Sequence, residues 1–189
     1  DSTYEGGRFV SYDPVKNVTE DFGIAAAGEG IITFALDVER MQAYLLTIPS
    51  GYLMRFDIAT RKFFNVGKIP SHGSICRSIA VDAQGNVYGS YEDNGIFIYD
   101  RKKEKLFFHD DLLPKHATAE WESASRGGVN KVGRNLWRAI SYDEKSNTLY
   151  GILASTSQVF SFDCATKVVK EFIPLISERS LQRLDEIYP

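Results

Sequence analysis

The stretch Arg77–Lys105, RSIAVDAQGNVYGSYEDNGIFIYDRKKEK, decides the fold because it contains three short strand patterns in succession. RSIAV, NVYGSY and GIFIYD are short runs rich in β-branched and aromatic residues, and turns rich in Gly, Asn and Asp separate them. LFFHDDLL follows as a fourth strand pattern. Period-two alternation, β-branched and aromatic enrichment and short polar turns are typical of antiparallel strands. The stretch therefore predicts a four-stranded antiparallel unit.

The same unit recurs along the chain, and an aspartate ends its first and third strands. The third strands FVSYD, LMRFD, IFIYD and VFSFD end at Asp13, Asp57, Asp100 and Asp163. The first strands TFALD, SIAVD and AISYD end at Asp37, Asp82 and Asp143. Since an aspartate carboxylate accepts backbone N–H groups two residues on, we predict that these residues hold turns and are not catalytic.

Four-stranded antiparallel units of 40 to 50 residues, strung head to tail, are the blades of a β-propeller. The sequence therefore predicts an all-β partial propeller at 1–176 with about three and a half blades. The half-blade lies at 3–25 and the whole blades at 31–69, 77–113 and 137–176. An inserted loop at 114–135 precedes the last blade, and the tail at 177–189 has the apolar spacing of a short amphipathic helix or a closing segment.

Three and a half blades are too few to close a ring, because propellers have about four to eight. Unclosed blades would also leave apolar sheet edges exposed, which natural proteins avoid. We therefore expect the chain to be the C-terminal half of a longer propeller, whose missing blades are supplied in cis or by another chain.

The pattern D-x-x-G-N-x-Y at Asp82–Tyr88, followed by an outer strand ending in Tyr-Asp at Phe97–Asp100, resembles propellers of the gluconolactonase, virginiamycin B lyase and NHL-like superfamily. The resemblance implies that ligands bind where loops from strand four to strand one, and from strand two to strand three, surround the channel. It also implies a lyase or hydrolase that uses a divalent metal. The corresponding inner-strand positions here carry arginine, so the sequence leaves the cofactor undecided.

Two arginines occupy the same repeat position, five residues before the first-strand aspartate. They are Arg77 in CRSIAVD and Arg138 in WRAISYD, and Ile32 stands at this position in the preceding blade. A planar guanidinium at the mouth of an inner strand suits a carboxylate, sulfate or phosphate. A salt bridge between blades is the alternative interpretation.

Further candidates lie in loops that the repeat places on the same face. His72 in PSHGSIC has the chemistry of a general base, a hydrogen-bond donor or a metal ligand. The insertion is long for a propeller loop, and long loops are usually functional or mobile. It contributes Glu120 as a candidate acid–base residue, and Trp121, His116 and Arg126 as candidate ligand-binding residues. Tyr52 in IPSGYL is a further ligand-binding candidate. For each single residue the alternative is an ordinary surface or packing role.

Composition narrows the function classes. With 43% apolar and 25% charged residues the chain has an average globular composition. A net charge of -3 gives no reason to expect nucleic acid or an anionic membrane as a partner, and no apolar run is long enough to span a bilayer. The two cysteines, Cys76 and Cys164, are expected to be free thiols.

These observations predict a propeller domain that binds, and acts on, an anionic small molecule or acidic carbohydrate at the channel mouth, as a secreted or periplasmic lyase or hydrolase. No HExxH, P-loop, GxSxG or cysteine-rich zinc pattern is present in the sequence. The alternative is therefore a non-catalytic propeller that binds a glycan or a protein, or that serves as a scaffold.

Overall fold

A computed structural model of the chain describes residues 3–70, 76–91, 94–113, 136–153, 157–175 and 179. Within these residues, fourteen strands form one two-stranded and three four-stranded antiparallel sheets. We call the first sheet the half-blade and the others blades one, two and three. The half-blade contains β1 (Arg8–Asp13) and β2 (Val18–Ile24), and blade one contains β3 (Gly30–Asp37), β4 (Gln42–Ile48), β5 (Tyr52–Asp57) and β6 (Lys62–Lys68). Blade two contains β7 (Ala80–Val81), β8 (Val87–Tyr91), β9 (Gly95–Asp100) and β10 (Lys105–His109), and blade three contains β11 (Trp137–Asp143), β12 (Thr148–Leu153), β13 (Gln158–Asp163) and β14 (Val169–Pro174).

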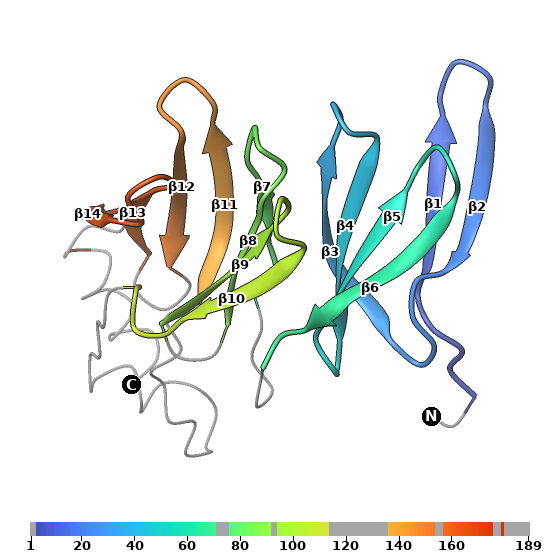
Figure 1. Cartoon of the computed structure of the whole chain (residues 1–189), viewed down its shortest axis with the longest axis horizontal. Helices are drawn as coiled ribbons and strands as arrows, with labels where there is room; N and C mark the ends of the chain where they lie inside the picture. Colours follow the sequence, from blue (N-terminus) through green and yellow to red (C-terminus); the bar gives the residue numbers. More distant parts are fainter. Residues whose placement is uncertain are drawn as a thin grey trace.

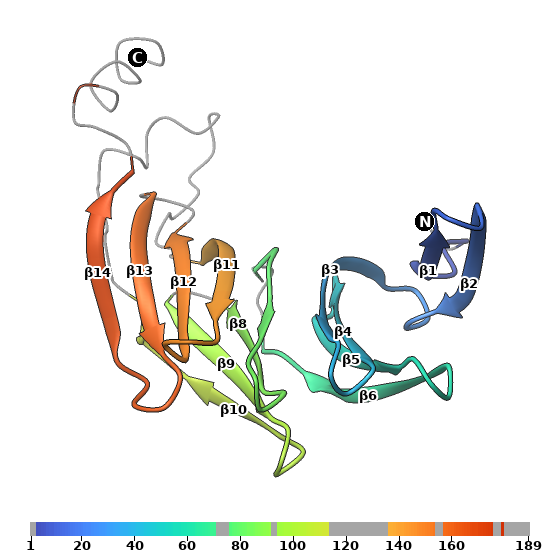
Figure 2. The same cartoon turned by 90° about the horizontal axis from the view of Figure 1, so that it is seen from above.

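Each blade is a simple meander in which neighbouring strands follow one another in sequence. The sheets stand side by side (Figure 1), and from above they form an open arc with β3, β7 and β11 on its inner side (Figure 2). The predicted all-β propeller of four-stranded antiparallel blades, with about three and a half blades, is confirmed. The inserted loop at 114–135 and nearly all of the tail at 177–189 lie outside the described residues. No helix among the described residues has the length and apolar character needed to cross a bilayer.

The repeated aspartates hold the turns as predicted. The Oδ1 atom of Asp57 accepts a hydrogen bond from the backbone N–H of Thr60 at 2.7 Å, and that of Asp82 accepts the N–H of Gln84 at 2.9 Å. Equivalent bonds form at Asp13, Asp37, Asp100, Asp143 and Asp163. Backbone N–H donors lower the pKa of Asp13, Asp57, Asp100 and Asp163, because they stabilise the ionised carboxylate. These carboxylates are therefore structural.

The residue four positions after the aspartate has a left-handed backbone in six of these turns. The six residues have φ between 50° and 62° and are Asn17, Met41, Arg61, Glu104, Asn147 and Lys167. Four-residue hairpin loops are commonly built around a type I turn, and their last residue is left-handed here. None of the six is glycine, so this conformation could not be read from residue type.

The core lies between the sheets, and one aromatic contact recurs at each interface. The residue before the third-strand aspartate contacts an aromatic ring of the preceding sheet. Ring centroids are 4.8 Å apart for Phe56 and Phe22, 5.8 Å for Tyr99 and Tyr44, and 5.9 Å for Phe162 and Tyr88. Because blades pack face to face, each sheet needs a neighbour on both sides to bury its two apolar faces.

Glycine in the second strand makes room for an aromatic ring of the third. Gly89 pairs with Phe97, and a Cβ added at Gly89 would lie 2.1 Å from the Phe97 ring. Gly151 and Phe160 repeat the arrangement in blade three, where the distance would be 2.5 Å. The glycine is therefore required by packing and does not mark a turn.

We expect Gly89→Ala to lower the free energy of unfolding by about 1–3 kcal/mol, because the added methyl group overpacks against the buried Phe97. Ser141→Ala, at an exposed position of β11, is the control and should change it by no more than about 0.5 kcal/mol. Urea unfolding followed by circular dichroism measures both. Equal stability of Gly89→Ala and the wild type would contradict this account of the packing of Phe97 against Gly89.

Candidate functional site

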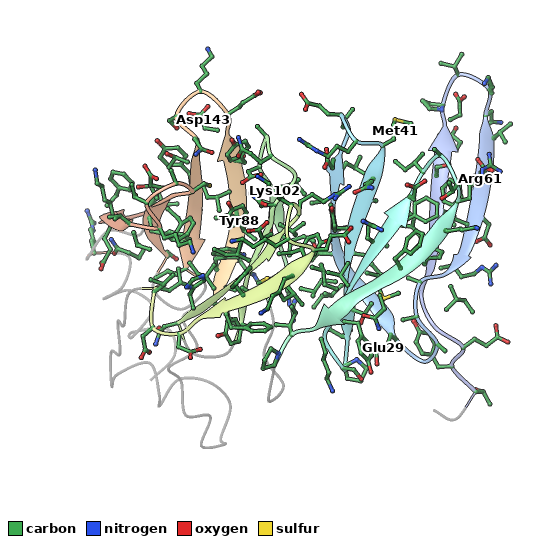
Figure 3. All side chains as sticks on the ribbon, in the orientation of Figure 1. Glu29, Met41, Arg61, Tyr88, Lys102 and Asp143 are labelled. Carbon is green, nitrogen blue, oxygen red and sulfur yellow. The ribbon has the colours of Figure 1, made fainter. Side chains whose placement is uncertain are left out.

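The described ends of the connections between sheets, and of those between second and third strands, lie at the end of the arc opposite the aspartate turns. Figure 3 shows this polarity: Glu29 lies at the lower end, whereas Met41 and Asp143 lie in turns at the upper end. We call the lower end the rim. Arg77 precedes β7 and Arg138 lies near the start of β11, so both belong to the rim.

A single buried serine anchors the residues that precede the two arginines. Ser90 on β8 is fully buried, and its backbone oxygen accepts the N–H of Cys76 at 3.1 Å. The Ser90 N–H donates to the Cys76 Sγ at 3.2 Å, and the Ser90 Oγ accepts the N–H of Trp137 at 3.0 Å. The backbone just before Arg77 and the backbone just before Arg138 are therefore held by one residue.

Trp137 joins blade three to blade two through hydrogen bonds to Ser90 and Ser78. Its side chain is 1% exposed, its indole Nε1–H donates to the carbonyl oxygen of Ser78 at 2.7 Å, and its ring stacks on Phe160 at 6.0 Å. Buried tryptophans usually satisfy their N–H in this way. Since Ser78 directly follows Arg77, these contacts hold the backbone on both sides of Arg77 and just before Arg138.

Both arginines are exposed, and in blades one and three a register shift occurs at the repeat position of the arginines. Arg138 lies in the register shift between Trp137 and Ala139, and Ile32 lies in the corresponding shift of β3. Such bulges re-aim a side chain away from the regular pleat. Among the described residues, neither guanidinium forms an ion pair or a hydrogen bond. The salt bridge between blades, which the sequence left open as an alternative, is not found in that part of the chain.

Tyr52 lies on the rim but packs at a different interface. Its ring is half-buried in the cluster between the half-blade and blade one, with the Lys68 Nζ 5.8 Å from the ring centroid. Cys76 and Trp137, the neighbours of the arginines, belong to the core between the blades. The chain neighbours of Arg77 and Arg138 thus share the anchor Ser90, whereas Tyr52 packs between the half-blade and blade one. His72, His116, Glu120, Trp121 and Arg126 lie outside the described residues, and their roles stay predictions.

Both cysteines are free, as expected. Burial raises the pKa of the Cys76 thiol to about 11, although this residue is adjacent to Arg77. Burial also raises the pKa of Cys164 to about 11. Cys76 is 1% exposed and packs in the core between the blades, which supports a packing role for this residue.

Glu29 is a buried rim carboxylate that the sequence reasoning did not single out. It is 6% exposed, and its Oε2 accepts the Thr47 hydroxyl at 3.0 Å and the Ser50 N–H at 2.9 Å. These bonds hold the loop between β4 and β5 against the entry of β3. An acidic residue between two glycines, just before an inner strand, is the signal that could have identified it.

The rim does not fit a divalent metal in the part that the structure describes. There, no three His, Cys, Asp or Glu side chains are grouped so that they could hold a metal ion. Hard divalent cations need several oxygen ligands, whereas the matched rim positions carry arginine. We therefore derive no chemistry through a metal.

A groove lies between blades two and three. The groove has a volume of about 250 Å³, and its lining includes Tyr88, Phe107, His109, Cys164 and Lys167. The Lys167 Nζ lies 3.4 Å from the His109 Nε2. Partial burial lowers the pKa of His109, and the neighbouring Lys167 charge lowers it further against the opposing effect of Asp110.

This lowered pKa predicts a pH-dependent stability. The unfolded histidine takes up a proton near its ordinary pKa of about 6.5, before the folded one does. The free energy of unfolding that the neutral His109 contributes is therefore fully present above that pH, and it is lost as the pH falls below that value. We expect His109→Gln to flatten the fall in unfolding free energy between about pH 7.5 and 5, measured by urea titrations. Lys167→Met should flatten it partly, whereas a slope unchanged in both variants would contradict the assignment.

Comparison with known proteins identifies the fold and no closer relationship. No family model matches the sequence, and neither does any curated protein. Virginiamycin B lyase from Staphylococcus aureus aligns with a TM-score of 0.64 at 10% identity, over 92% of this chain and 51% of that chain. An auxiliary nutrient binding protein from Bacteroides thetaiotaomicron aligns with a TM-score of 0.52 at 12% identity, over 89% and 42%. The WD40 repeats of RRP9 align with a TM-score of 0.56 at 10% identity, over 79% and 40%.

The chain therefore has the β-propeller fold and spans about half the length of the solved structures it matches. A lyase, a nutrient binding protein and a set of WD40 repeats share this architecture. Since one fold hosts unrelated activities, the function must be argued from the rim itself.

Proposed function

We propose that the rim binds an anionic small molecule or an acidic carbohydrate through Arg77 and Arg138. The observation that carries this proposal is the matched pair of exposed guanidinium groups, which have no described protein partner while their neighbours are anchored to Ser90. Arginine presents planar, bidentate donors that suit a carboxylate, sulfate or phosphate.

Rigid anchoring supports a binding role more than a solvated-surface role. Trp137 and Cys76 are both 1% exposed, so the backbone that carries each arginine has little freedom. A ligand then loses less free energy to ordering of the site, because only the two side chains must be immobilised. Each charge-assisted hydrogen bond contributes about 1.5–3 kcal/mol, which makes two arginines sufficient for a measurable affinity.

The proposed site includes more than the described rim. His72, Trp121, His116 and Arg126 would surround the anion, and blades from outside the 189 residues, in cis or from another chain, would complete the channel mouth. The proposed setting is extracellular or periplasmic, where acidic glycans are available.

Catalysis is the second candidate function. His72 precedes Arg77 by five residues in the same connection, and a general base there would move a proton of an anion held by the arginines. Glu120 is the other acid–base candidate. The reaction would be that of a lyase or hydrolase, and the alternative is a glycan- or protein-binding propeller without turnover.

For binding, we expect Arg77→Ala and Arg138→Ala each to lower the affinity for sulfate and for glucuronate about tenfold or more, because each removes a charge-assisted bidentate donor. Arg→Lys at the same positions should recover only part of the loss. Isothermal titration calorimetry measures these affinities.

Lys102→Ala is the matched control, because it removes one positive charge from an exposed turn away from the rim (Figure 3). It should leave both affinities unchanged. Affinity for neutral glucose equal to that for glucuronate, or unaltered binding in both arginine variants, would overturn the anion site.

For catalysis, we expect His72→Ala to lower the turnover of uronate-containing oligosaccharides about 10²–10⁴-fold while glucuronate binding persists. Formation of unsaturated uronate product distinguishes elimination from hydrolysis. An unchanged rate would remove His72 from the mechanism, and absence of turnover in the wild type would favour the binding-only alternative.

A further inference from the structure

The half-blade has a free edge that faces an apolar groove. In the described chain β1 pairs only with β2, whereas each corresponding third strand, β5, β9 and β13, is flanked on both sides. A groove of about 490 Å³ lies between β1 and β3, and its lining includes Phe9, Val10, Ile31 and Phe34. We call this groove and the free edge of β1 the open seat. Unpaired strand edges beside apolar surface are sites for addition of another strand.

The repeat itself shows what normally covers this place. The first-strand residues three positions and one position before the aspartate face the preceding sheet. In blade one they are Phe34 and Leu36, each 52% exposed. In blade two the residue three positions before the aspartate, Ile79, is only 5% exposed. The equivalent residues Val81, Ile140 and Tyr142 are partly buried against the core.

The difference arises because blades two and three each follow a sheet with four strands. Blade one follows a sheet that has only the two outer strands among the described residues, so no described strand lies against the inner half of its face. The outer half is already covered, since Phe9 of β1 contacts Phe56 at a centroid distance of 5.3 Å, and Phe9 reaches Phe34 only edge-on at 5.6 Å. The uncovered area is therefore the area that two inner strands would occupy.

We propose that the open seat takes a β-hairpin, the first and second strands of the same blade, from a part of this protein's own polypeptide outside the 189 residues. The second strand of that hairpin pairs antiparallel with β1, and apolar side chains of its first strand cover Phe34 and Leu36. The turn of the hairpin contains an aspartate and lies at the end of the molecule where the other aspartate turns lie. All seven described first and third strands run toward that end.

The same polypeptide is the source that the observations favour. In the described chain each inner hairpin is already part of its own four-stranded sheet, so a second copy has none to donate. The matched propeller from Staphylococcus aureus is about twice as long as the aligned part, so that fold accommodates the additional strands within one chain. The inference refines the proposed completion of the propeller and does not depend on anion binding.

The test attaches a hairpin in cis. The sequence of residues 137–153, which forms the β11–β12 hairpin, is joined ahead of residue 1 of the full 189-residue chain. Covalent linkage raises the effective concentration of the hairpin, so a weak pairing becomes visible. We expect the midpoint of thermal unfolding to rise by about 4–8 °C, from burial of two large apolar side chains and pairing of β1.

Single substitutions identify the seat. Phe34→Asp should destabilise the 189-residue chain alone only by the loss of the edge contact with Phe9, because this side chain is half exposed, yet it should abolish the gain from the hairpin. Phe172→Asp is the control: Phe172 is 48% exposed on the outer strand β14, and the gain should persist. Hydrogen exchange of the β1 amides, with and without the hairpin, provides a second measurement and should show new protection.

No gain in the thermal midpoint together with unprotected β1 amides would overturn the proposal, as would a gain that survives Phe34→Asp. Sedimentation of the 189-residue chain tests the source. A dimer that Phe34→Asp converts to a monomer would show that a second copy fills the seat and would overturn the assignment to the same polypeptide. Anion titrations of the Arg77 and Arg138 variants are independent of these results, so failure of one proposal is distinguishable from failure of the other.

Discussion

The contact between blades two and three at Trp137 is the constraint on which both the packing and the rim depend. Its indole donates to Ser78, its backbone N–H donates to Ser90, and its ring stacks on Phe160. One residue thus ties the start of β11 to β8 and to the segment that precedes β7. Because the same bonds hold the residues beside Arg77 and Arg138, the interaction that joins the blades also positions the candidate ligand-binding groups.

A propeller blade is stable only when both faces are covered, and this requirement explains the uneven exposure along the arc. Leu45 and Phe56 of blade one are fully buried by the half-blade, whereas Phe34 and Leu36 on the same side remain half exposed. All four side chains are apolar, but Phe34 and Leu36 lie on the inner strand β3, whereas Leu45 and Phe56 lie on strands farther from the channel. The exposure of the second pair therefore reflects which strands are present beside it.

The fold could be predicted because its signals are local and repeated. Period-two alternation identifies strands, and seven aspartates identify turns whose side-chain hydrogen bonds form within four residues of each carboxylate. The candidate site was less accessible. Repeat alignment found Arg77 and Arg138, but Ser90, which holds their neighbours, carries no distinguishing pattern, since its role depends on Trp137, 47 residues away. Glu29 has a local signal, its place between two glycines, but its role depends on Thr47 and Ser50, which are distant in sequence.

The sequence by itself determined the blade: its strand order, its aspartate turns and the repeat position that carries arginine at two inner strands. These properties arise from hydrogen bonds and alternation within a few residues, so the residue order is enough to specify them. Only the tertiary structure decided which thiol is buried, which glycine accommodates a ring, and which apolar positions stay uncovered. Those properties depend on which groups pack against each residue in space. The residue order around Phe34 and Leu36 therefore does not show that these side chains stay exposed.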